Sequence, residues 1–165
     1  RKSVRIPLKI NHKSLTVNCE PDSTLASVLR SLQLFSVKDG CGDGFCGSST
    51  VLLDEKPVPS CLIPVSAVKD RSVVTLEYFM QSDSYADIAQ AFEKNGIKLC
   101  GFCDAGRIFA AKEILELNQR PDKKKIAELL RTFSCPCAED ESLVKGIIAA
   151  ADIRRKRLGN RYGLR

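Results

Sequence analysis

Seven of the eight cysteines in this 165-residue chain fall into two groups, and this grouping constrains the fold more than any other feature. The first group contains Cys41, Cys46 and Cys61, with Ser49 between the second and the third. The intervals match plant-type [2Fe–2S] proteins, in which a cysteine would occupy the place of Ser49. The first half is therefore expected to wrap a loop around iron and sulfide.

The second group combines a CxxC pair, Cys100 and Cys103, with a CxC pair, Cys135 and Cys137. Each pair directly precedes a predicted helix. The positive ends of helix dipoles favour an anion at that place, which is a physical reason for this spacing around an iron–sulfur cluster. Two such groups indicate a chain that moves single electrons.

Other chemistries fit the second group less well. Zinc also takes four cysteines, but usually from two CxxC pairs. A dithiol redox motif at 100–103 would follow a strand and open a helix of a βαβ unit, and no such strand is predicted here. Residues 1–10 are basic and lack an apolar signal core, so a cytoplasmic location and metal binding are expected rather than disulfides.

Glycines surround the predicted ligands. Gly42, Gly44 and Gly47 can adopt backbone angles that let the loop wrap closely and point its amides at the sulfides. Gly101, inside the CxxC pair, is assigned the same cofactor-binding role. An ordinary tight loop would also use glycines, so the nearby cysteines favour the first interpretation.

Charge excludes some partners. The formal net charge is +6, and residues 151–165 contribute six basic residues and one acidic one. This basic segment is expected to be a solvated C-terminus or to dock onto an acidic partner. Aromatic residues do not alternate with the basic ones, so no nucleic-acid groove is predicted. No apolar run reaches the ~20 residues of a membrane span.

Periodicity predicts an α+β chain. Residues 4–10 and 15–19 alternate in polarity and form a hairpin. Residues 21–24 (PDST) then supply a helix start, and the apolar face of this helix contains Leu25, Val28, Leu29 and Leu32. Further strands are predicted at 50–53, 58–63 and 73–78, and a linker at 79–84. Four helices should follow, starting at Ser84 in a capping box with Asp87, after Gly106, after Asp122 and from about Glu139, with Leu129 and Phe133 among their inward residues.

Cys19, the eighth cysteine, ends an alternating strand and is predicted to be a small buried residue. It could replace Ser49 as a ligand only if that strand end lies close to the loop.

Three segments carry a family resemblance: CGDGFCGSSTVLLDEKPVPSCL at 41–62, CGFC-x-x-G at 100–106 and CPC at 135–137. Together they resemble the iron–sulfur subunit, or N-terminal iron–sulfur region, of the xanthine dehydrogenase/aldehyde oxidase family of molybdenum hydroxylases. The resemblance runs from about Val4 to Ala151. It implies a β-grasp, plant-ferredoxin-like domain (1–79) followed by an all-α four-helix domain (80–165), each binding one [2Fe–2S] cluster.

The resemblance also implies a function. Electrons would pass from molybdopterin on a large subunit, through both clusters, to FAD on a medium subunit of a hetero-oligomeric oxidoreductase. This chain would contain no catalytic residue and no substrate site. The alternative is a structural or assembly subunit that retains only the cluster of the helical domain. The implied metal ligands are Cys41, Cys46, Ser49, Cys61, Cys100, Cys103, Cys135 and Cys137.

The chain departs from the family pattern at four places. Ser49 replaces a cysteine, and because an alkoxide is a harder donor, a lower potential and a more labile first cluster, or none, are expected. Leu99 replaces a glutamine that contacts the pterin. Asp104-Ala105 replaces Thr-Pro, and aspartate still caps a helix. Around 135–140, the basic residue between the two cysteines and the Gly-Tyr after them are absent.

Overall fold

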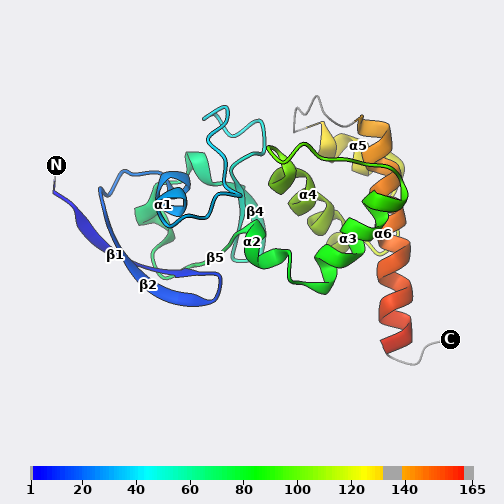
Figure 1. Cartoon of the computed structure of the whole chain (residues 1–165), viewed down its shortest axis with the longest axis horizontal. Helices are drawn as coiled ribbons and strands as arrows, with labels where there is room; N and C mark the ends of the chain where they lie inside the picture. Colours follow the sequence, from blue (N-terminus) through cyan, green and yellow to red (C-terminus); the bar gives the residue numbers. More distant parts are fainter. Residues whose placement is uncertain (1, 132–138, 162–165) are drawn as a thin grey trace.

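The fold begins with a five-stranded mixed sheet and ends with packed helices (Figure 1). The computed structural model describes residues 2–131 and 139–161. The strand order is β2-β1-β5-β3-β4, with β1 and β5 parallel and the other neighbours antiparallel. The strands are β1 (Val4–Ile10), β2 (Lys13–Cys19), β3 (Thr50–Leu53), β4 (Lys56–Pro59) and β5 (Ser72–Val74).

The predicted hairpin is confirmed. Asn11 and His12 both have positive φ angles, 50° and 65°, as a two-residue hairpin turn requires. Ile6, Leu8 and Ile10 alternate onto the buried face of β1. Helix α1 (Leu25–Ser31) covers this face, and its predicted start is confirmed, because the Thr24 hydroxyl accepts a hydrogen bond from the Ser27 amide. The prediction was wrong for Leu32, which follows the last helical residue and is 38% exposed. We call these strands and α1 the sheet region.

Two strands are shorter than predicted. The predicted strand 73–78 stops at Val74, and α2 (Leu76–Phe79) follows. The buried Thr75 amide binds the Asn11 side chain at 2.9 Å, which ends the ladder. The predicted strand 58–63 stops at Pro59, and the turn η1 (Ser60–Leu62) follows. Pro57 and Pro59 lack backbone amides, which is compatible with the place of β4 at the edge of the sheet.

Four helices form what we call the helical region. They are α3 (Asp83–Lys94), α4 (Asp104–Leu117), α5 (Lys123–Leu130) and α6 (Asp140–Arg161). No helix within the described ranges is long and apolar enough to cross a membrane. Most predicted inward side chains are buried, but Leu129 is 45% exposed and Phe133 lies outside the described residues. The predicted capping box at Ser84 is wrong, because Ser82 caps α3 by accepting the Tyr85 amide.

The two regions share a core. Leu52 of β3 and Val74 of β5 pack with the apolar residues of the helices rather than with the α1 side of the sheet. At the margin of this contact, the buried ammonium of Lys112 on α4 donates to the Glu55 carbonyl at 3.3 Å and pairs with Glu116 at 3.0 Å. The helical region is therefore held against the β3–β4 side of the sheet.

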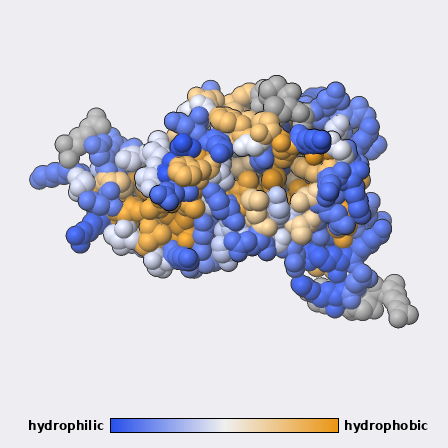
Figure 2. All heavy atoms as spheres, viewed as in Figure 1, coloured by the Kyte–Doolittle hydropathy of each residue, from blue (hydrophilic) through white to orange (hydrophobic). Residues whose placement is uncertain are grey.

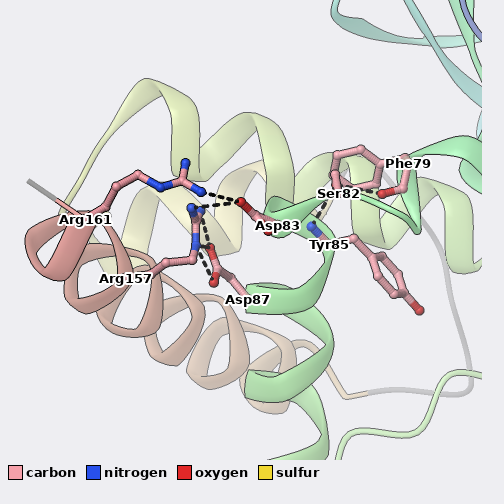
Figure 3. A network of polar contacts seen from close by, with 7 residues as sticks. All are labelled: Phe79, Ser82, Asp83, Tyr85, Asp87, Arg157 and Arg161. Atoms are coloured by element: carbon pink, nitrogen blue, oxygen red, sulfur yellow. Dashed lines mark hydrogen bonds and ion pairs between the residues drawn. The ribbon is translucent and has the colours of Figure 1, made fainter.

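The basic segment at the C-terminal end of α6 packs onto α3 of the same chain (Figure 3). Arg157 makes a two-pronged contact with the buried carboxylate of Asp87, at 2.7 and 3.0 Å, and Arg161 donates to Asp83 at 3.3 Å. Hydrogen bonding to Asp87 raises the pKa of Arg157 above its usual value. Part of the basic character seen in the sequence thus serves internal ion pairing.

Removing Asp87 should destabilise the helical region measurably. Asp87→Ala leaves a partly buried arginine without its carboxylate, and we expect a loss of about 2–3 kcal/mol in the free energy of unfolding. Asp83→Ala is the matched control, since Asp83 is 61% exposed and its pairs should contribute less than about 1 kcal/mol. Urea unfolding of both variants measures the difference. Equal losses would contradict this assignment of the Arg157–Asp87 contact.

Candidate metal centres

The first site lies where the loop after α1 meets the β3–β4 hairpin. Ser49 directly precedes β3, and Cys61 lies in η1 directly after β4. Because Thr50 of β3 pairs with Pro59 of β4, the chain brings Ser49 and Cys61 together. The Cys61 amide donates to the Ser49 hydroxyl oxygen at 3.3 Å. The serine in the place of the third thiolate therefore stands beside the fourth predicted ligand.

The other two predicted ligands of this site are also neighbours. The Cys46 amide donates to the Cys41 sulfur at 3.3 Å, and the Ser48 amide lies 3.4 Å from the Cys46 sulfur. The Ser48 hydroxyl oxygen is 2.9 Å from the same sulfur. Polar hydrogens thus point at the sulfurs, which is how proteins stabilise the negative charge of a thiolate cluster.

The glycines of the loop are required by its conformation. Gly42, Gly44 and Gly47 have φ angles of 73°, 79° and 76°, in the left-handed region. At Gly44 space is also limiting, because a Cβ atom there would lie 2.6 Å from the Leu62 side chain. These observations account for the glycines as loop formers. Their contact with a cofactor stays a prediction.

The donor set of the first site fits a [2Fe–2S] cluster. Cys41 is exposed, Cys46 and Cys61 are partly buried, and Ser49 is buried. Within residues 2–131 and 139–161, no three His, Cys, Asp or Glu side chains converge as they would around one metal ion. A binuclear cluster instead spreads its ligands around two irons and two sulfides, with soft sulfur donors predominating.

Cys46 should be unusually reactive in the metal-free chain. Burial alone would raise its pKa, but hydrogen bonds from the Cys41 backbone and from Ser48 outweigh burial and lower the pKa to about 7. The rate of alkylation by iodoacetamide should therefore reach half its maximum at about pH 7, because only the thiolate reacts. Cys19, whose pKa is raised by burial, is the internal control. Equal pH profiles for the two thiols would contradict the prediction.

The structure describes two of the four predicted ligands of the second site. Cys103, and not Asp104 as predicted, is the N-terminal cap residue of α4, and Cys100 is exposed. Gly101 has a φ of 86°, and its amide donates to the Asp104 carboxylate at 2.9 Å, which folds the CxxC loop over the helix end. Cys135 and Cys137 lie outside the described residues. Cys103 thus lies at the positive end of α4, where an anionic cluster is favoured.

A glycine contact between the two sites was missed in the sequence. Gly106 lies in the first turn of α4, three residues after Cys103, and not before the helix as predicted. A Cβ atom on Gly106 would lie 2.8 Å from both the Cα atom and the carbonyl oxygen of Gly47. The start of α4 therefore rests directly on the loop of the first site. A glycine inside a helix costs about 1 kcal/mol relative to alanine, which was the available signal for such a packing role.

Two other sequence predictions concern residues near these sites. Leu99 is partly buried and packs against the apolar core of the helices, so its side chain makes apolar contacts beside Cys100. Cys19 is partly buried at the end of β2 and packs against the core of the sheet region, in line with its prediction as a small core residue.

Comparison with known proteins identifies the chemistry of the second half. The family model described as "[2Fe-2S] binding domain" matches residues 75–148. The small subunit of nicotine 6-hydroxylase from Paenarthrobacter nicotinovorans is 33% identical, covering 97% of this chain and 94% of that protein. The xanthine dehydrogenase iron-sulfur-binding subunit of Escherichia coli O157:H7 is 30% identical, covering 89% and 94% respectively.

A solved structure shows the same fold. The match to a chain in the crystal structure of quinoline 2-oxidoreductase from Pseudomonas putida 86 has a TM-score of 0.84 and 32% identity. It covers 94% of this chain and 98% of that one. Both halves of the present fold are therefore found together in a single chain of an oxidoreductase.

Proposed function

This chain belongs to the iron–sulfur subunits of the xanthine dehydrogenase/aldehyde oxidase family of molybdenum hydroxylases, and we propose that it carries electrons from a molybdopterin-containing large subunit towards an FAD-containing medium subunit. Hydroxylation of a heterocycle or an aldehyde would take place on the large subunit. The present chain would act as the non-catalytic electron-transfer subunit of the complex.

The contact between Gly106 and Gly47 carries this proposal. At this contact, the helix that begins after Cys103 packs directly against the loop that contains Cys46. Electron transfer over a short distance needs two carriers held at a fixed separation. A backbone contact without intervening side chains keeps that separation fixed. A chain with a purely structural role would not need a backbone contact of this kind between the start of α4 and the loop of the first site.

The ligand assignment rests on the spacing of the cysteines and on the family resemblance. Residues 1–79 are proposed as one domain and 80–165 as the other, each supplying four ligands to one cluster. When bound, each cluster supplies a centre that gains and loses one electron. The chain's own thiols would hold the clusters, and at the first site the amides of Cys46 and Ser48 would orient the Cys41 and Cys46 sulfurs. The proposed ligands are Cys41, Cys46, Ser49 and Cys61 for the first cluster, and Cys100, Cys103, Cys135 and Cys137 for the second.

Exposed apolar side chains beside both sites support partner subunits. Phe45 and Leu62 at the first site are each 53% exposed, and Phe102, within the CxxC pair, is 46% exposed. On the face shown in Figure 2, hydrophobic residues gather near the middle of the molecule, whereas the lower end of α6 is hydrophilic. Large exposed apolar groups around ligand loops are typical of surfaces that another protein covers.

A second candidate function rests on Ser49. If its hydroxyl does not bind iron, the first site remains incomplete, and the chain would serve the complex through the helical-domain cluster alone. The sheet region would then contribute to the assembly of the multi-subunit complex.

The partner proposal is tested on the complex from its native cells. The chain, purified with an affinity tag under mild anaerobic conditions, should contain about one molybdenum and one FAD for every two [2Fe–2S] clusters. Iron-containing chain that lacks both molybdenum and flavin in every preparation would overturn the proposed function.

A further inference from the structure

Ser48 is fully buried and directed at one of the proposed ligands. Its hydroxyl oxygen lies 2.9 Å from the Cys46 sulfur, and its amide lies 3.4 Å from the same atom. Its carbonyl accepts the Lys38 amide at 2.9 Å, which fixes the residue from its other side. One serine therefore presents two hydrogen-bond donors to one sulfur.

The direction of the hydroxyl bond follows from the chemistry of the ligand. In the metal-free chain either atom can donate. A thiolate bound to iron has no proton, so only the serine hydroxyl can then donate. Hydrogen bonds to ligand sulfurs stabilise the more negative, reduced state of a cluster and raise its reduction potential.

We propose that Ser48 is a positioning residue that raises the reduction potential of the first cluster by donating its hydroxyl to the Cys46 thiolate. The inference rests on the proposed function, because it requires a cluster at this site. It also gives Ser48 and Ser49 opposite effects. The alkoxide of Ser49 would lower the potential as a hard ligand, and the hydroxyl of Ser48 offsets part of that shift.

Gly40 encloses this pair. A Cβ atom on Gly40 would overlap the Ser48 hydroxyl and lie 2.8 Å from the Cys46 sulfur. The glycine therefore allows the backbone to close over the serine and the sulfur. Its close approach leaves little room for the Ser48 hydroxyl to rotate away from the sulfur.

Ser48→Ala tests the proposal in a redox titration followed by EPR on the anaerobically purified chain. Losing a hydrogen bond to a charged sulfur should lower the ratio of reduced to oxidised first cluster about tenfold at a fixed potential, equal to about 59 mV for one electron. Thr50→Val is the matched control, because the buried Thr50 hydroxyl, two residues further on at the start of β3, donates to the Gly47 carbonyl. Its potential should not change.

The remaining outcomes are distinguishable. The signal absent from Cys41→Ala identifies the first cluster, and the second cluster's signal reports that each variant has folded. A first-cluster potential that is the same in Ser48→Ala and wild type overturns the role of Ser48 alone. Loss of the first cluster in Ser48→Ala but not in Thr50→Val also overturns it, because the hydroxyl would then serve assembly. A wild-type chain without a first cluster overturns both this inference and the two-cluster function.

Discussion

Replacing Ser49 with alanine is expected to remove the first cluster and to halve the iron and acid-labile sulfide of the purified chain. Ser49 is buried, and its hydroxyl oxygen lies beside Cys61, whose amide it accepts. Alanine removes the oxygen donor at the position of the missing thiolate. Iron should fall from about four to about two atoms per chain, at two per cluster.

Two further variants separate ligation from loop structure. Ser49→Cys should keep about four irons and make the first cluster more resistant to air, because thiolate is a softer donor than alkoxide. Ser60→Ala removes a buried hydroxyl that donates to the Ser49 carbonyl, and it should leave the iron content unchanged. Four irons and an unaltered first-cluster signal in Ser49→Ala would show that Ser49 is not a ligand.

Replacing Gly106 with alanine is expected to move the start of α4 away from the loop of the first site. The new methyl group would meet the Gly47 backbone at 2.8 Å, and a backbone cannot move aside as a flexible side chain can. Overpacking of this kind costs about 1–3 kcal/mol. The magnetic interaction between the two reduced clusters, measured by EPR, should weaken because it falls steeply with their separation.

Gly146→Ala is the control for this variant. Gly146 is also a helical glycine, and a Cβ atom there would meet the side chains of Ile97 and Phe92 within the helical region. Both variants gain similar helix propensity, but only Gly106→Ala disturbs the contact between the sites. An unchanged interaction between the clusters in Gly106→Ala would contradict the role given to the glycine pair.

Local patterns predicted much of the fold. Alternating polarity located the β1–β2 hairpin, and capping residues such as Thr24 and Asp122 located the starts of α1 and α5. These features depend on neighbouring residues in the sequence. The spacing of the first group likewise predicted two pairs of neighbours that the fold forms, Cys41 with Cys46 and Ser49 with Cys61.

Features that depend on distant residues were not predictable. The end of β5 is set by Thr75, whose amide binds the side chain of Asn11, 64 positions earlier in the chain. Asp87 looked like a capping residue, but its partner Arg157 lies 70 positions away. Such pairs become visible only when the tertiary structure is known, because no local pattern connects them.

The two-cluster assignment is tested most directly by measuring how much iron and sulfide each chain binds and how many EPR signals it gives. Iron and acid-labile sulfide should be measured on the anaerobically purified wild-type chain, with EPR spin quantitation after reduction by dithionite. We predict about four irons, about four sulfides and two distinct S = 1/2 signals per chain. About two irons and a single signal would contradict the assignment and leave the helical-domain cluster as the chain's one redox centre.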